Sequence, residues 1–270
     1  MTFATTDLTA RIGTQIHSEL ETLLSGRHAR DIRELLEQRG ALVIPCIHFT
    51  DEQQLAFART LGGVVDQGDK GVFKVSLDPA ENDKADYLHG TVLWHFDGFS
   101  DDVPSLASLL SARALSATGG QTEFANTYAA FEELPASEQQ ALQELRVVHN
   151  MTANQRDVYP DASPARREAW SRFPDKIHPL VWTHRSGRRS LLLGASASHI
   201  VGMDPQEGRS LLDRLTAWAT QSRYVYRHEW SLGDLVMWDN TGALHRVEAY
   251  PADSGRMLHR VTLIGEETVA

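Results

Sequence analysis

Short apolar runs separated by turn residues constrain the fold of this chain most. Runs of strand length lie at 41–47, 72–77, 191–193, 224–230, 234–238 and 257–264. Apolar residues at helical spacing predict helices at 27–40, 127–147 and 204–220, and another follows the capping box Thr50-Asp51-Glu52-Gln53. We therefore predict a mostly β fold with flanking helices, of the sandwich or jelly-roll kind.

The chain is predicted to form a single domain, 1–270, because it contains no internal repeat or linker. The segment 150–178 holds Pro160, Pro164 and Pro174 among many charged residues. A connection of this length inside a compact domain is typical of a lid or a binding loop. We therefore expect 150–178 to help shape a ligand pocket.

Charge and cysteine content exclude several classes of protein. The net charge of −10 at pH 7 argues against nucleic acid or an anionic membrane as a partner, since both select for basic patches. Cys46 is the single cysteine, so an intramolecular disulfide or a thiolate metal cluster cannot form. It lies in the apolar run 41–47 and is predicted to be a buried strand residue. The sequence shows no signal peptide and no apolar run of membrane-spanning length, which predicts a cytoplasmic protein.

Candidate metal ligands occur in the segment Leu93-Trp94-His95-Phe96-Asp97. In a strand, residues two apart face the same side, so His95 and Asp97 would point into one cavity. An imidazole and a carboxylate are two of the three ligands in the facial triad of non-haem iron oxygenases. A His-x-Asp pair is nevertheless expected about once by chance in a chain with this many histidines and aspartates. A polar pair at a strand end is therefore the competing interpretation.

Residues near the C-terminus strengthen the metal-site interpretation. His245 lies five residues after Asn240, and Arg256 and Arg260 follow it by eleven and fifteen residues. If 256–264 is a strand, both arginines share one face, and His259 lies on the other face. Two arginines beside a metal site can each clamp a carboxylate through the planar guanidinium. The alternative is a pair of surface arginines on an edge strand.

The ordered set of motifs resembles the taurine/2,4-D (TauD/TfdA) dioxygenase family, over roughly residues 35 to 265. The segments that carry the resemblance are Trp94-His95-Phe96-Asp97, Gly119-Gly120-Gln121-Thr122-Glu123-Phe124, Trp238-Asp239-Asn240, His245, Arg256 and Arg260. The chain is more similar to the phenoxyacetate (2,4-D) branch of this family than to taurine dioxygenase. That closer likeness rests on the segments 196–200, 207–209, 219–221, 225–228 and 233–240.

The resemblance implies a double-stranded β-helix (jelly roll) core and an Fe(II)/2-oxoglutarate-dependent dioxygenase that also consumes O2. It assigns Fe(II) to His95, Asp97 and His245. It assigns the distal carboxylate of 2-oxoglutarate to Thr122 and Arg256. The implied reaction is hydroxylation of a substrate carbon, with decarboxylation of 2-oxoglutarate to succinate and CO2.

The substrate implied by the resemblance is a small anionic organic molecule. Arg260 matches the family position that reaches the anionic group, and Lys74 and His199 match positions near the substrate in the phenoxyacetate branch. Residues 98–104 and 150–178 depart from both named enzymes, so the resemblance implies a class of substrate and not one compound. The family often forms dimers or tetramers, so a homo-oligomer is also open.

Other outcomes and classes remain open at this point. Desaturation uses the same fold and cofactors, whereas halogenation is disfavoured because Asp97 keeps the carboxylate ligand. A non-catalytic jelly-roll protein could bind an anion through Arg256 and Arg260, and a Zn(II) hydrolase could use the same three metal ligands. The histidines at positions 149, 178, 184 and 228 are predicted to be structural.

Overall fold

The computed structural model describes residues 3–270. Its largest sheet has seven strands in the order β1-β2-β3-β13-β5-β15-β4, and only β2 and β3 run parallel to each other. The bounds are β1 Ala4–Asp7, β2 Thr14–His17, β3 Ala41–Ile44, β4 Phe73–Val75, β5 Ala107–Ala114, β13 Leu235–Asp239 and β15 Met257–Leu263.

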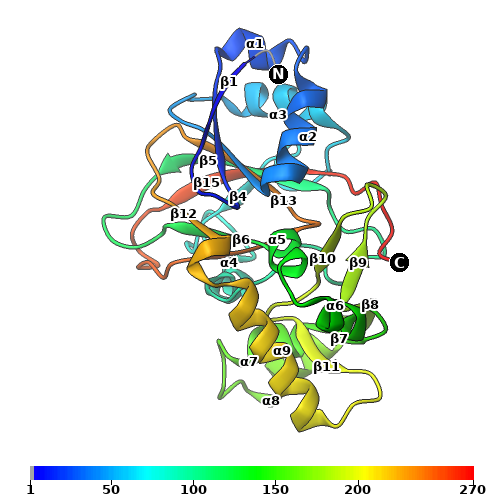
Figure 1. The fold of residues 1–270 in the computed structure, drawn as a ribbon. Coiled ribbons are helices and arrows are strands. Elements are labelled where there is room, and N and C mark those ends of the chain that lie inside the picture. The colour runs from blue at the N-terminus through cyan, green and yellow to red at the C-terminus, as the bar shows by residue number, and fades with distance from the viewer. Residues whose placement is uncertain (1–2) are drawn as a thin grey trace.

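Three smaller sheets complete the strand set (Figure 1). One has the order β12-β6-β14, with bounds Val225–His228, Thr122–Asn126 and Ala243–Val247. Another has the order β11-β7-β8, with bounds Ala197–Ile200, Arg146–His149 and Lys176–Pro179. The last pairs β10 (Arg189–Leu191) with β9 (Val181–Thr183).

Helices gather at the two ends of the molecule (Figure 1). At one end lie α1 Leu20–Leu24, α2 Ala29–Arg39 and α3 Asp51–Leu61. Toward the other end lie α7 Met151–Arg156, α8 Pro164–Ser171 and α9 Pro205–Ala219. The remaining helices are α4 Ala85–Leu88, η1 His89–Val92, α5 Thr127–Glu132, α6 Ala136–Leu142 and η2 Ser222–Tyr224. Within residues 3–270, none of these helices combines the length and the apolar character that crossing a membrane requires.

Local signals in the sequence set several helix ends as predicted. Thr50 caps α3 in a capping box, because its side chain accepts from the Gln53 backbone N–H while the Gln53 side chain bonds back to Thr50. Gly40 ends α2 at a φ of 69°, a backbone conformation that glycine adopts without steric cost. Asp204 caps α9 by accepting from two backbone N–H groups, and Pro205 follows at its first position.

Two predictions about local structure were wrong. Cys46 is exposed in a turn with a φ of 48°, because β3 ends at Ile44 opposite Leu235, where its partner strand begins. The single helix expected over 127–147 is divided into α5, α6 and strand β7. Pro135 lies between the two helices, and proline lacks the N–H that a continuous helix would need there.

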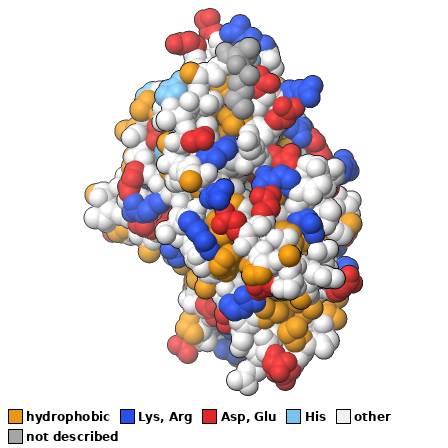
Figure 2. All heavy atoms as spheres, in the orientation of Figure 1, with side chains coloured by type: hydrophobic (Ala, Val, Ile, Leu, Met, Phe, Trp, Pro, Cys, Tyr) orange, Lys and Arg blue, Asp and Glu red, His pale blue; other side chains and the backbone are white. Residues whose placement is uncertain are grey.

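The segment 150–178 also contains more regular structure than a long loop. It holds α7, α8 and the start of β8. Asn150 and Ser163 cap these two helices through their side-chain oxygens. Many charged residues of this segment therefore lie on short helices. Over the visible face of the whole molecule, Figure 2 shows positive and negative side chains interspersed.

A buried cluster lies between the large sheet and the β12-β6-β14 sheet. It contains Phe124 from β6 and Trp238 from β13, with Leu110 from β5 and Leu258 from β15. The rings of Phe124 and Trp238 lie 5.5 Å apart. This cluster forms the base on which the candidate site is built.

Candidate metal centre and adjoining cavity

His95 and His245 are joined through their backbones. The His245 N–H donates to the His95 carbonyl at 2.8 Å, and the His95 N–H donates to the His245 carbonyl at 3.1 Å. His245 lies on β14 opposite Phe124, whereas His95 forms an isolated bridge and Asp97 lies in the following turn. The regular strand expected around His95 is therefore reduced to one paired residue. The pairing still places the two imidazole rings 4.1 Å apart.

Asp97 completes a group of three donors. Its Oδ1 lies 4.0 Å from His95 Nε2 and 3.8 Å from His245 Nε2. One ligand atom from each of the three residues lies within 4.8 Å of the others. His95 Nδ1 is bonded to the Leu93 carbonyl at 2.8 Å, so Nδ1 carries the ring proton and Nε2 presents a free lone pair.

The charges of the three side chains suit a divalent metal. Burial lowers the pKa of both His95 and His245, which keeps the imidazoles neutral and able to ligate. Burial of Asp97 opposes its ionisation, but the adjacent Arg260 guanidinium, together with the two histidine rings and the Ser108 hydrogen bond, outweighs it, so the pKa of Asp97 is lowered. Two neutral imidazoles and one carboxylate are the donor set that non-haem Fe(II) oxygenases use.

Arg256 forms a buried positive end beside these donors. Its Nη2 donates to the Gly120 carbonyl at 2.8 Å, and its guanidinium lies over the Tyr250 ring at 4.5 Å. Gly120 has a φ of +84°, and a Cβ at this position would lie 2.7 Å from Arg256 Nε. Gly120 of the Gly-Gly-Gln-Thr turn therefore makes room for the arginine.

Thr122 lies next to Arg256 at the start of β6 and is buried. Its Oγ1 accepts a hydrogen bond of 3.0 Å from Trp230 Nε1. Thr122 and Arg256 line the same cavity as His95 and His245. A hydroxyl and a guanidinium at one end of a cavity are suited to a carboxylate.

Arg260 occupies the same cavity from the middle of β15. Its Nη1 donates to Asp97 Oδ2 at 3.2 Å, and its guanidinium lies 5.1 Å from the Phe73 ring centre. Its Nε is buried and has no hydrogen-bond partner among residues 3–270. A buried donor without a partner is costly, which makes this guanidinium a candidate for an anion.

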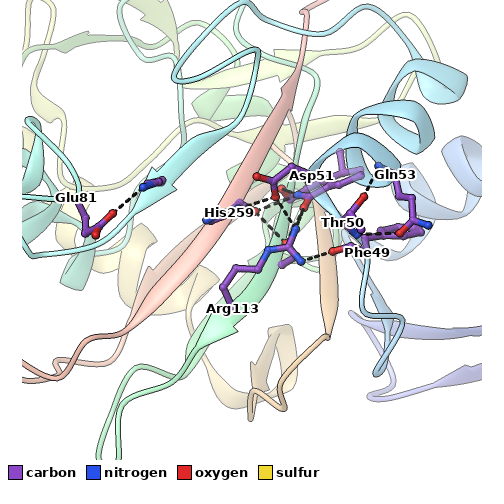
Figure 3. A network of polar contacts seen from close by, with 11 residues as sticks. Phe49, Thr50, Asp51, Gln53, Glu81, Arg113 and His259 are labelled. Carbon is purple, nitrogen blue, oxygen red and sulfur yellow. Dashed lines mark hydrogen bonds and ion pairs between the residues drawn. The ribbon is translucent and has the colours of Figure 1, made fainter.

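Alternation along β15 directs Arg260 and His259 to opposite faces, as predicted. Arg260 is paired with Phe73 of β4, and His259 with Lys74. His259 Nδ1 lies 2.7 Å from Asp51 Oδ1 at the start of α3, and Arg113 also bonds to Asp51. Figure 3 shows Asp51, Arg113 and His259 directed toward one another.

The structure does not bring Lys74 and His199 to the cavity. Lys74 is exposed, lies opposite His259 and bonds to Glu81 Oε2 at 2.6 Å; Figure 3 shows this Glu81 contact apart from the His259 network. His199 is exposed on β11, and its nearest side-chain partner is Ser198, at 3.2 Å. Neither residue lines the cavity that holds the metal-ligand candidates.

The four histidines predicted to be structural each have a polar contact with the protein. His149 contacts Ser196, His178 the Phe99 carbonyl, His184 Ser190, and His228 Asp234. Burial lowers the pKa of His149 to about 3 and that of His184 to about 4, so both rings are neutral.

Sequence reasoning missed three residues that support the candidate site. Ser108 donates to Asp97 Oδ2 at 3.4 Å, and Asn240 Nδ2 donates to Ser108 at 3.2 Å. Asn240 also accepts from Trp238, whose ring lies 4.7 Å from that of His245. Trp230 is the third. The Trp238-Asp239-Asn240 motif marked Asn240 without assigning it a role, whereas nothing in the sequence singles out Ser108 or Trp230.

This chain is similar to several known proteins. A family described as "Taurine catabolism dioxygenase TauD, TfdA family" matches residues 4–262. An alpha-ketoglutarate-dependent 2,4-dichlorophenoxyacetate dioxygenase of Cupriavidus pinatubonensis is 36% identical, over 93% of each chain. An (S)-phenoxypropionate/alpha-ketoglutarate dioxygenase of Sphingobium herbicidovorans is 30% identical, over 87% of this chain and 86% of the relative.

One solved structure aligns with this chain over the full length of both proteins. The crystal structure of AAD-2 in complex with Mn(II) and N-oxalylglycine has a TM-score of 0.85 and 33% sequence identity. The match therefore extends from the sequence pattern to the arrangement of the elements. The chain belongs to the TauD/TfdA family and is an Fe(II)- and 2-oxoglutarate-dependent dioxygenase.

Proposed function

We propose that this enzyme hydroxylates a small anionic organic substrate, with Fe(II) held by His95, Asp97 and His245. The observation that carries the proposal is the arrangement of one cavity. Two imidazoles line it together with Arg256, which is buried, and Arg260, which bonds to Asp97. Arg246 also lines the cavity, but its charge is paired with Glu123. We also infer that the seven-stranded sheet and the β12-β6-β14 sheet form the two halves of a jelly roll, and that 1–270 functions as one domain.

The end of the cavity at Arg256 is suited to the distal carboxylate of 2-oxoglutarate. Burial lowers the pKa of Arg256, and a bound carboxylate would offset the cost of burying its charge. The Thr122 hydroxyl would add a second donor. N-oxalylglycine, which the solved relative holds beside Mn(II), differs from 2-oxoglutarate by an amide N–H in place of one methylene.

Bound Fe(II) would supply the activation of O2 that couples 2-oxoglutarate oxidation, to succinate and CO2, to oxidation of a substrate C–H bond. The protein's own residues would orient the metal ligands and the bound molecules, and would keep water out of the site. His95 keeps its free nitrogen toward the metal through the Leu93 carbonyl, and Ser108 holds the second oxygen of Asp97.

Arg260 would anchor the anionic group of the substrate. Its unpartnered Nε can donate to a carboxylate while Nη1 keeps its bond to Asp97. The nearby cavity wall is apolar, with Val75, Leu88 and Leu258 contributing. An anionic head with an apolar body, as in an aryloxyalkanoate, matches this combination better than a fully polar acid does. The substrates named for the relatives, phenoxyacetates, phenoxypropionates and sulfate esters, share that character.

The segment 150–178 would serve as a roof over the substrate. Leu88 of α4 and Thr91 of η1 line the cavity. Tyr159, which precedes α8, and Arg166 of α8 both donate hydrogen bonds to Asp86 of α4. Tyr87 of α4 and Phe173 after α8 also meet, at 6.3 Å between ring centres. A change in the position of 150–178 would therefore reach the cavity through α4.

A succinate-release screen tests the proposal. Aryloxyalkanoates, sulfonates, sulfate esters and acylated amino acids would be supplied with Fe(II), 2-oxoglutarate and ascorbate. We expect release with at least one apolar anion and transfer of one oxygen atom to a substrate carbon; where that carbon bears an ether, sulfate or sulfonate group, the hydroxylated product would break down to a carbonyl compound and a phenol, sulfate or sulfite. Loss of two hydrogens without added oxygen would indicate desaturation. Arg260→Gln should raise KM for the substrate more than KM for 2-oxoglutarate. The opposite order would exchange the roles of Arg256 and Arg260.

A further inference from the structure

Trp230 lies directly behind Thr122, outside the group of residues that line the cavity. Strand β12 is paired with β6 so that His228 lies opposite Thr122, and Trp230 follows two residues later. Its indole Nε1–H donates to Thr122 Oγ1 at 3.0 Å. The indole nitrogen is a donor only, so the direction of this hydrogen bond is fixed.

This bond determines what Thr122 can offer to a ligand. A threonine hydroxyl has one hydrogen and two lone pairs. The indole uses one lone pair, which turns the hydroxyl hydrogen away from Trp230 and leaves it free for an acceptor in the cavity. With Arg256 beside it, this end of the cavity then presents donors to a ligand.

A buried network holds the indole in place. His228 and Trp230 meet edge to face, with ring centres 4.6 Å apart and an interplanar angle of 90°. His228 is fixed on both sides, because its Nε2 lies 3.1 Å from Asp234 Oδ2 and its Nδ1 lies 2.8 Å from the Tyr226 hydroxyl. Asp234 accepts in addition from the backbone N–H groups of Ser231 and Cys46.

We propose that Trp230 is a positioning residue for the co-substrate: it orients the Thr122 hydroxyl as a donor and thereby selects a 2-oxo acid with an anionic tail. The inference rests on the proposed function, because it takes 2-oxoglutarate to lie between Thr122 and Arg256. Trp230 does not touch the ligand and acts only through Thr122.

Equilibrium binding to the Mn(II)-loaded enzyme tests this role without relying on turnover. Trp230→Phe removes the N–H donor and keeps a ring against His228. We expect calorimetry to show about a fivefold to tenfold loss of 2-oxoglutarate affinity, the size of one lost hydrogen bond. The affinity for 2-oxopentanoate, which has no anionic tail, should stay unchanged. Equal loss for both acids, or no loss for either, would overturn the proposal.

Trp218→Phe is the matched control. Its indole also donates a single bond, to the Ala130 carbonyl at 2.8 Å, on the remote helix α9. It should leave both affinities unchanged. If Trp230→Phe fails to fold, Trp230→Met removes the same donor and carries the same expectation.

A double-mutant cycle with Thr122→Val separates action through Thr122 from a general structural effect. If Trp230 acts through this hydroxyl, the double variant should bind 2-oxoglutarate as weakly as Thr122→Val alone. Additive losses would contradict the proposal. Wild-type enzyme that fails to bind 2-oxoglutarate at all would instead refute the proposed function, so the two failures are distinguishable.

Discussion

The base of the cavity and its proposed roof, the segment 150–178 with α4, are built in different ways. The base comes largely from paired strands: His245 is buried and paired through its backbone on β14, and the buried Arg256 donates to the Gly120 carbonyl. The roof comes from short helices whose contacts, such as Asp86 with Arg166, lie at the exposed surface. Strand pairing fixes positions tightly, whereas exposed ion pairs contribute little to stability. The base can therefore hold the chemistry constant while the roof varies with the substrate.

The largest expected effect comes from removing a metal ligand in the base. His245→Ala should lower Fe(II) affinity by more than about a hundredfold, since changes to residues that merely support ligands already cost 10- to 100-fold. Fe(II)-dependent succinate release should fall with it. His17→Ala, at an exposed position on β2, is the control and should match the wild type. If His245→Ala bound Fe(II) normally, His245 would not be a metal ligand, and the base would not be the part of the cavity that holds the metal.

Gly120→Ala tests whether the base tolerates a single added carbon. The new Cβ would lie 2.7 Å from Arg256 Nε, so Arg256 must move and 2-oxoglutarate affinity should fall at least about tenfold. Gly187→Ala is a close control, because Gly187 has a similar φ of +85° but nothing within 4 Å of the added carbon. Both variants should lose about 1–2 kcal/mol of stability from the left-handed backbone conformation. Unchanged 2-oxoglutarate binding in Gly120→Ala would show that Arg256 is not held by this turn.

Asp239, at the end of strand β13, gives the folded protein a pH dependence. Its pKa is raised to about 6 because it is buried, against a usual value of 3.8. Between pH 4 and pH 6 the unfolded chain therefore loses this proton more readily than the folded chain does, and stability falls as pH rises. The loss should be on the order of 2–3 kcal/mol and should level off above that window.

Asp239→Asn should remove this component. The amide oxygen can still accept from Thr241, which donates to Asp239 through both its backbone N–H and its hydroxyl. Denaturant unfolding of the variant and the wild type at several pH values measures the difference directly. A difference that stays constant from pH 4 to pH 7 would contradict the raised pKa.

The smallest effect on stability is expected in the roof. Asp86→Asn weakens the contacts with Tyr159 and Arg166, both at the surface, and should cost less than about 1 kcal/mol. KM for the organic substrate should nevertheless change, while 2-oxoglutarate affinity stays the same. Glu34→Gln, in the exposed Arg30–Glu34 pair of α2, is a control that should change neither. A loss of 2-oxoglutarate affinity in Asp86→Asn would show that base and roof are not separable.

The sequence allowed most of the base to be predicted and little of the roof. His245 lies on β14 and Arg260 on β15, with Arg256 just before β15, and alternation within a strand correctly separated His259 from Arg260. The position of Lys74 could not be read in the same way. It depends on which residue of β15 lies opposite, and pairing between distant strands leaves no signal in a single sequence.

Other misses have similar causes. Cys46 looked like a strand residue because its neighbours are apolar, but the strand ends where its partner β13 begins. Charges and prolines in 150–178 concealed α7 and α8, whose side-chain caps at Asn150 and Ser163 are local signals that were present. Support from Ser108 and Trp230 arises only when β5 and β12 are folded beside their partners.

An anaerobic titration tests the central claim most directly. Fe(II) and 2-oxoglutarate would be added to the wild-type enzyme and to His245→Ala while the visible spectrum is recorded. Chelation of Fe(II) by the keto oxygen and carboxylate of 2-oxoglutarate gives a visible charge-transfer band. We predict that the band appears in the wild type only when both are present, and that His245→Ala fails to form it. A wild type without the band, or a variant that forms it as strongly, would contradict the assignment of the metal centre.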